Sequence, residues 1–365
     1  MKTFLLALCV FLGPSVHAQL TADQIAQKHV DAIGGIEAID SLHSLVYRGA
    51  YHEPGPMPAD KPLIPHTYQA FMRPYYEAIG DPAEKYHDVR EGFDGSSWEY
   101  YGDPGIVLRT VGAAASASRH AVEFLQDALV DYKEKGTTLE LRGTEKIAAK
   151  DAYKLFAKYL DGSERLVFVD MQTFLIIADR KTAPIHAFGQ AVTSESRYSD
   201  FRPVNGVLFH FSELEVEIAT GRVLSEMRKI SIEANTITDA SAFTPAPFTR
   251  TPLQQFLELL YMERTDHVCV MNTYRLFRRA HPEMDTRDGV EFIGYQMVKM
   301  SDYKGAIELL RANAADYPKS ASSQFGLGRA YKAAGETALA KEAFEHALQI
   351  NPNYKRASDG LNGLR

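Results

Sequence analysis

The pattern of apolar and polar residues divides the chain into three parts. Over 25–33 the apolar residues recur at helical spacing, after a capping-box pair formed by Thr21 and Gln24. From Ser44 to about residue 234 the pattern alternates with a period of two, which is typical of strands. The helical period returns after residue 253. We therefore expect an α+β region followed by an all-α region.

Within the middle part, turn pairs such as Asp94-Gly95, Asp161-Gly162 and Asn205-Gly206 separate the alternating segments. The expected strands cover 46–51, 67–78, 98–101, 138–142, 152–160, 165–170, 174–181, 191–201, 207–219 and 223–234. A short helix is expected over 36–42. A second is expected over 113–135, where Leu125, Leu129 and Tyr132 recur at helical spacing. These elements predict an antiparallel meander of roughly nine to eleven strands.

Proline marks two further segments. Five prolines between residues 54 and 65 predict a loop there, and Pro245, Pro247 and Pro252 predict a linker over 241–252. Helices are expected to follow over 253–264 and 268–280.

The first eighteen residues have the features of a signal peptide. Lys2 precedes an apolar run too short to span a bilayer, and Val16-His17-Ala18 is a small-residue cleavage site. We expect cleavage after Ala18 and an exported protein, periplasmic if the source is Gram-negative. Removal of Lys2 changes the formal charge from −7 to −8, which argues against nucleic acid as a partner. Only Cys269 remains, within an apolar run where we expect a buried thiol and no disulfide.

Residues 287–354 repeat themselves with a period of 34. Gly294 returns as Gly328, Ala306 as Ala340 and Pro318 as Pro352. This pattern resembles the tetratricopeptide repeat, a helix–turn–helix unit of that length, with copies at 287–320 and 321–354. The resemblance implies a binding module without chemistry of its own, which docks a protein or peptide partner. In that frame the first helix of each unit lines the groove, and the expected partner-binding residues are Glu291, Tyr295, Phe325, Arg329 and Lys332.

Short motifs of the middle part resemble a second family. They are residues 32–38, 143–147, 161–163, 170–175 and 199–206, which are mostly turns. In this order they are similar to exported relatives of the periplasmic lipoprotein carriers, the LolA-like superfamily. The resemblance implies an incomplete antiparallel barrel over 19–240, curved around helices, whose apolar hollow holds acyl chains.

An apolar hollow can solubilise a lipid because each buried methylene contributes about 0.8 kcal/mol. The aromatic residues expected to line it are Trp98, Tyr100, Phe168, Phe209 and Phe211. Aromatic residues that alternate along strands also serve as plain core, so a filled barrel in a pure interaction adaptor remains an alternative.

The sequence contains no G-x-S-x-G, H-E-x-x-H or phosphate-loop motif, and its histidines are not spaced as metal ligands. We therefore expect no catalytic activity, metal or cofactor. A hydrolase that uses His and Asp from loops is the remaining enzymatic alternative, and it would bring titratable residues together in a cleft.

Overall fold

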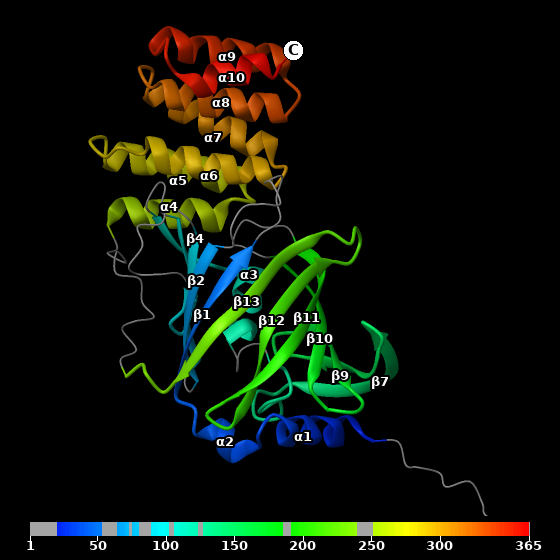
Figure 1. The fold of residues 1–365 in the computed structure, drawn as a ribbon. Coiled ribbons are helices and arrows are strands. Elements are labelled where there is room, and N and C mark those ends of the chain that lie inside the picture. Colours follow the sequence, from blue (N-terminus) through cyan, green and yellow to red (C-terminus); the bar gives the residue numbers. More distant parts are fainter. Residues whose placement is uncertain are drawn as a thin grey trace, which may run out of the picture.

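The computed structural model describes residues 20–52, 64–72, 75–79, 89–101, 106–122, 127–184, 191–238 and 251–364. The expected signal peptide at 1–18 lies outside these residues, as do most of the proline-rich segment 54–65 and of the linker 241–252. An open antiparallel sheet fills the middle of the molecule, with short helices at one end and a stack of helices at the other (Figure 1).

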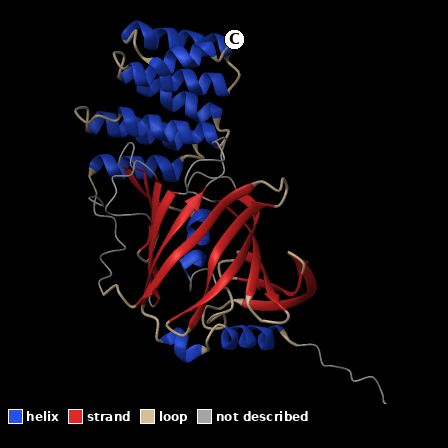
Figure 2. Cartoon of the chain, in the orientation of Figure 1, coloured by secondary structure: helices blue, strands red, loops and turns tan. Residues whose placement is uncertain are grey.

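The sheet has thirteen strands among the described residues, and its two halves run outward from β1 and β13 in the order β6-β5-β4-β3-β2-β1-β13-β12-β11-β10-β9-β8-β7. Neighbouring strands are antiparallel throughout. The strands are β1 (Ser44–His52), β2 (Ile64–Met72), β3 (Tyr75–Ile79), β4 (Val89–Phe93), β5 (Ser97–Tyr101), β6 (Ile106–Arg109), β7 (Thr138–Ile147), β8 (Lys150–Lys158), β9 (Glu164–Asp170), β10 (Ile176–Pro184), β11 (Ala191–Val204), β12 (Val207–Glu217) and β13 (Val223–Ala234). Because β6 and β7 do not pair, the sheet is curved but not closed, as Figure 2 shows. The half-barrel expected from the sequence is thus confirmed.

The structure differs from the expectation in several elements. The described sheet has thirteen strands, against the nine to eleven expected, and β4 and β6 are not among the strands expected from the sequence. The single strand expected over 67–78 is the hairpin of β2 and β3, whose strands pair from Met72 and Tyr75 outward. The helix expected over 113–135 ends much earlier, since α3 spans Gly112–Val122 and residues 131–136 form turns. Leu129 and Tyr132 therefore keep the helical spacing by coincidence, and Leu129 is buried against other parts of the chain.

The short helices α1 (Ala22–Ala32) and α2 (Ile36–Asp40) cover one end of the sheet (Figure 1). The capping box predicted for α1 is present, with Thr21 and Gln24 bonded reciprocally. Ile25 of α1 is buried with Leu155, Val167 and Val169 of β8 and β9. Those strand residues alternate with outward-facing ones, so this contact defines the inner face of the sheet. Helix α3 lies within the curve of the sheet (Figure 2).

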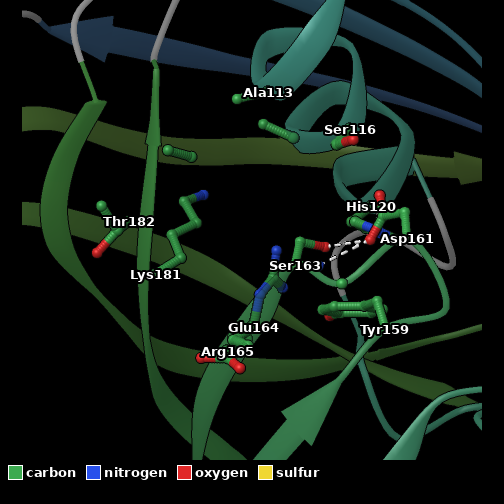
Figure 3. Close-up of a pocket in the computed structure, with 13 residues that line it drawn as sticks. Ala113, Ser116, His120, Tyr159, Asp161, Ser163, Glu164, Arg165, Lys181 and Thr182 are labelled. Carbon is green, nitrogen blue, oxygen red and sulfur yellow. Dashed lines mark hydrogen bonds and ion pairs between the residues drawn. The ribbon is translucent and has the colours of Figure 1, made fainter.

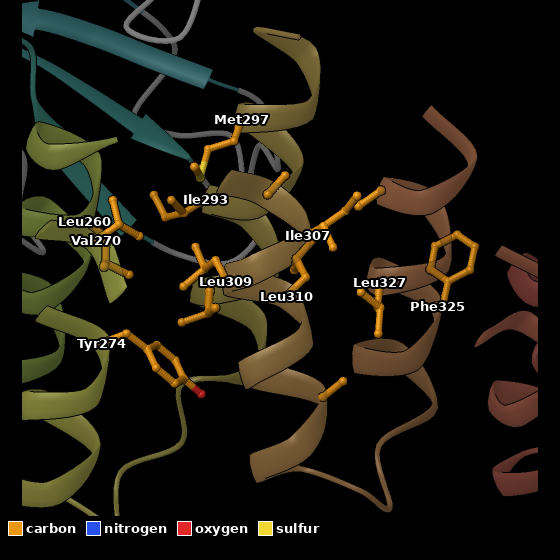
Figure 4. Packing of buried hydrophobic residues seen from close by; sticks show 14 of the residues in the cluster. Leu260, Val270, Tyr274, Ile293, Met297, Ile307, Leu309, Leu310, Phe325 and Leu327 are labelled. Atoms are coloured by element: carbon orange, nitrogen blue, oxygen red, sulfur yellow. The ribbon is translucent and has the colours of Figure 1, made fainter. Parts of the chain in front are cut away.

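Helices α4–α10 stack beyond the sheet. They are α4 (Pro252–Glu263), α5 (His267–Ala280), α6 (Arg287–Lys299), α7 (Tyr303–Asp316), α8 (Ala321–Ala333), α9 (Thr337–Ile350) and α10 (Lys355–Asn362). Figure 4 shows their apolar side chains meeting in one layer after another. Gly294 and Gly328 lie where paired helices approach most closely. A Cβ at Gly328 would be 2.6 Å from the ring of Phe344, and one at Gly294 would be 2.6 Å from Leu310. The small residues at the period of 34 are therefore required by packing.

The helical stack shares its core with the edge of the sheet. Tyr101, Ile106 and Leu108 of β5 and β6 belong to the same buried cluster as Phe256 and Leu260 of α4. The side chain of Gln254 also hydrogen bonds to the backbone N–H and C=O of Val107. Helix α4 thus covers the exposed edge of β6, a device that blocks pairing with other chains.

Candidate functional site

A pocket of about 380 Å³ lies on the inner face of the sheet, between α3 and strands β8–β10 (Figure 3). This volume falls within the range of small-molecule sites. Small residues of α3, namely Ala113, Ser116 and Ala117, leave this space open. The remaining lining comes from the β8–β9 hairpin and from β10, and it comprises Tyr159, Asp161, Gly162, Ser163, Glu164, Arg165, Lys181, Thr182 and Ala183, with His120 of α3.

One wall of the pocket is held by Asp161 at the tip of the β8–β9 hairpin. Its carboxylate accepts hydrogen bonds from the backbone and hydroxyl of Ser163, at 3.0 and 2.6 Å, and contacts Nε2 of His120 at 3.1 Å. Burial alone would raise the pKa of Asp161, but the hydrogen bonds from Ser163, Ser116 and His120 lower it well below its ordinary value. The ring of His120 stacks on Tyr159 at 3.8 Å. This cluster fastens α3 to the hairpin.

The same cluster bears on the hydrolase alternative. In a nucleophilic triad the carboxylate orients the imidazole, which in turn bonds the serine. Here the hydroxyls of Ser116 and Ser163 bond the carboxylate of Asp161. Asp161 therefore forms an Asx turn with Ser163 and attaches helix α3 to the hairpin through Ser116 and His120.

Two cations from neighbouring strands form the opposite wall. Arg165 of β9 and Lys181 of β10 are cross-strand partners. Arg165 is buried, and its Nη1 lies 3.7 Å from Oδ2 of Asp179, which is beyond hydrogen-bonding distance. The ammonium group of Lys181 makes neither a hydrogen bond nor an ion pair with any residue that the structure describes. Figure 3 shows its side chain extending from β10 into the pocket.

Buried polar side chains continue across the inner face toward β13. Tyr198 donates a hydrogen bond of 2.6 Å to Asp179, and Lys229 donates one of 2.8 Å to Nε2 of His210. Burial lowers the pKa of Lys229 to about 8. Burial alone would raise the pKa of Glu213, but the neighbouring His210 and the charge of Lys229 lower it to about 2. The inner face is therefore partly charged, whereas the family resemblance implied an apolar hollow.

The five aromatic residues expected to line the hollow are not brought together. Phe168 is fully buried and stacks under Arg180, on the face opposite to Val167 and Val169. Phe209 and Phe211 are buried in a cluster with Ile33, Ile39 and Leu45 near α2. Trp98 is buried and Tyr100 is half-buried on β5. None of the five lines the pocket described above, and their role in binding lipid remains a prediction.

The sequence reasoning missed Arg165 and Lys181, although a signal was present. Alternation along β9 places Arg165 on the same face as Val167 and Val169. A charged residue at an inward position of an otherwise apolar strand face indicates either a buried ion pair or a binding site. The expected apolar hollow instead predicts that aromatic residues line the binding site.

Four of the expected partner-binding residues do meet on the repeats. The guanidinium of Arg329 stacks on Tyr295 at 3.7 Å and lies 5.5 Å from the centre of Phe325. The side chain of Glu291 packs against Gly326 of α8. Burial lowers the pKa of Arg329. Lys332 is exposed one turn beyond Arg329 on α8.

No described helix combines the length and the apolar composition that a membrane span needs. No group of three or more His, Cys, Asp or Glu residues is arranged to hold a metal ion in the described part of the chain.

Comparison with known proteins supports the repeat resemblance found in the sequence. The tetratricopeptide repeat profile matches residues 321–354, the second repeat. No curated protein matches the chain. Among solved structures, a DUF1329 family protein from Desulfovibrio piger is 13% identical with a TM-score of 0.42, and the match covers 62% of this chain and 99% of that one.

A LolA superfamily protein from Nitrosomonas europaea is 16% identical with a TM-score of 0.41, again over 62% of this chain and 99% of that protein. An O-GlcNAc transferase mutant from Thermobaculum terrenum is 23% identical with a TM-score of 0.24, over 31% of this chain and 22% of the enzyme.

Proposed function

We propose that this chain is a non-catalytic binding protein that holds an amphiphilic ligand on the inner face of its half-barrel. The observation that carries this proposal is the pocket of about 380 Å³ between α3 and β8–β10. An unclosed sheet gives such a ligand a lateral entrance, because its edges β6 and β7 are not paired with each other. The resemblance to lipoprotein carriers agrees with an acyl chain as the apolar part.

The proposal is tested by analysing what the protein carries. Protein purified without detergent is extracted with organic solvent, and the extract is examined by mass spectrometry. We expect an amphiphile present at close to one molecule per chain. Protein that carries none, and that takes up no fatty acid when offered one, would refute the carrier role.

The repeats would supply the second half of the function by docking a protein partner. Tyr295 and Arg329 form a stacked aromatic–cation pair beside the buried ring of Phe325, a combination of residue types enriched at binding hot spots. Once a partner is known, Arg329→Ala tests this docking surface, and we expect the substitution to lower the affinity for that partner. Unchanged affinity would show that the partner docks on another surface.

A second candidate function is that of an adaptor whose barrel is filled by its own side chains. It is favoured by the burial of Phe168, Phe209 and Phe211, which offer little surface to a ligand. The extraction experiment separates the two functions, because a filled barrel carries no amphiphile.

We also infer that the protein is exported to the cell envelope. The inference depends on the signal-like residues 1–18. N-terminal sequencing of the mature protein is expected to begin at Gln19, and an intact Met1 would contradict export by this route.

A further inference from the structure

The charges of the pocket suggest what kind of ligand it takes. Its two cations, Arg165 and Lys181, project from neighbouring strands toward the same space. Two acids also line the pocket. Asp161 is engaged by Ser163 and His120, and Glu164 is exposed to solvent at the margin. Arg165 is ion-paired with Asp179 at 3.7 Å, which leaves Lys181 as the charge facing the interior that is bonded to no described residue.

Lys181 is the central residue in this arrangement. Alternation along β10 places it on the same face as Asp179, and it reaches into the pocket below α3 (Figure 3). Its charge also helps to lower the pKa of Glu213 on β12, though less than His210 and Lys229 do. The structure describes neither a hydrogen bond nor an ion pair to its ammonium group. The residue as a whole is half-buried, and its ammonium group is open to solvent or to a ligand.

Arg165 adds a second positive charge next to Lys181. Its side chain is 4% exposed, and its Nη1 forms a buried ion pair with Oδ2 of Asp179 at 3.7 Å. Lysine and arginine together form charge-assisted hydrogen bonds with carboxylate and phosphate oxygens. The small residues Ala113 and Ala117 on α3 leave room for such a group.

We propose that this pocket recognises the anionic head group, carboxylate or phosphate, of an amphiphile, and that Lys181 determines the preference for anionic over neutral ligands. The inference rests on the carrier role proposed above and deepens it. Arg165, held by Asp179 beside Lys181, adds positive charge where the head group would lie.

The test compares three ligands that share a hexadecyl chain and differ in their heads: hexadecanoic acid, hexadecyl phosphate and hexadecan-1-ol. Dissociation constants are measured with the full chain by equilibrium dialysis. We expect the acid or the phosphate to bind about tenfold more tightly than the alcohol, the effect of one charge-assisted hydrogen bond. Whichever anion is preferred distinguishes a fatty acid from a phospholipid as the source of the head group.

Lys181→Gln is expected to abolish that preference while the affinity for the alcohol stays the same. Lys158→Gln is the matched control, since it removes the same charge from an exposed position on β8 that is not part of the pocket. The thermal unfolding of both variants shows that they remain folded.

The outcomes separate the two proposals. Equal affinity of the wild type for all three ligands would overturn the head-group inference and leave the carrier role intact. Loss of the preference in Lys158→Gln, or its retention in Lys181→Gln, would also overturn it. Failure of all three ligands to bind would refute the carrier role and the inference together.

Discussion

The imidazole of His29 bonds the carboxylate of Asp127 at 2.7 Å and the backbone oxygen of Phe174 at 2.8 Å, through its two ring nitrogens. Both partners are acceptors, so both nitrogens must donate and the ring is an imidazolium. The side chain of His29 is only 3% exposed. The other carboxylate oxygen of Asp127 accepts from the backbone of Leu129 and Val130. One buried ion pair therefore fixes α1 to two segments that lie far away in sequence.

Removing one partner of this pair is expected to destabilise the fold. His29→Gln leaves the carboxylate of Asp127 buried without its counter-charge, which costs about 3–5 kcal/mol. The free energy of unfolding, measured by urea denaturation, is expected to fall by this amount. Lys133→Gln breaks the exposed ion pair with Asp23 and serves as the control, with a change below about 1 kcal/mol. Equal effects of the two substitutions would show that the His29 pair is not a structural anchor.

The same pair predicts a pH dependence. Burial would lower the pKa of His29, but the charge and hydrogen bond of Asp127 raise it above 6.5, so its contribution is lost as pH rises through that raised pKa. Burial would raise the pKa of Asp127, but His29 lowers it below 3.8, so its contribution is lost as pH falls through that lowered value. The stability difference between wild type and His29→Gln is therefore expected to be largest in the mildly acidic range and to shrink as pH increases. A difference that grows with pH would contradict the imidazolium.

The close approach of α8 and α9 gives a matched pair of glycine substitutions. Gly328→Ala places a methyl group 2.6 Å from the ring of Phe344 and is expected to destabilise by about 1–3 kcal/mol. Gly326→Ala lies on the same helix, where the new methyl group meets only the flexible side chain of Glu291. It is expected to be neutral or to stabilise by up to about 1 kcal/mol, because alanine favours helices. Thermal unfolding followed by circular dichroism compares the two, and the reverse order would be inconsistent with the repeat packing.

The core shared by β6 and α4 makes the two regions unfold together. Trp98, the one tryptophan of the chain, is buried on β5, the strand that contributes Tyr101 to this core, so its fluorescence reports on the sheet while circular dichroism follows the helices. The two signals are expected to change at the same temperature in the wild type. Leu108→Ala should destabilise by about 2–5 kcal/mol and separate them. Leu160→Ala, at a position 84% exposed, is the control, and separate transitions in the wild type would exclude a common core.

The sequence predicted the kinds of element well and several boundaries poorly. Alternation and turn pairs located the strands of the second half, and the period of 34 located the repeats, because both signals are local. The break between β2 and β3 was missed although Pro74 lies there, since the residues on both sides favour strands. Cys269 was expected to be buried, but α5 buries only Val270 and Tyr274 of that stretch and leaves the thiol exposed.

The candidate site could not be predicted from the sequence, for a different reason. Arg165 and Lys181 come from two strands, His120 and Ala117 from α3, and only the curvature of the sheet brings them together. The carrier resemblance also implies an apolar hollow, and an apolar hollow does not predict charged residues at the ligand site. Tertiary placement rather than local pattern decides such a site.

The central claim is that the space between α3 and β10 holds a ligand, and filling that space tests it most directly. Ala117→Phe places a ring in the pocket, whereas Ala333→Phe adds the same ring to an exposed position of α8. Binding of labelled hexadecanoic acid is measured by equilibrium dialysis for the wild type and both variants. We predict saturable binding by the wild type and Ala333→Phe and its loss in Ala117→Phe, with thermal unfolding showing all three to be folded. Undiminished binding by Ala117→Phe, or no binding by the wild type, would contradict the account.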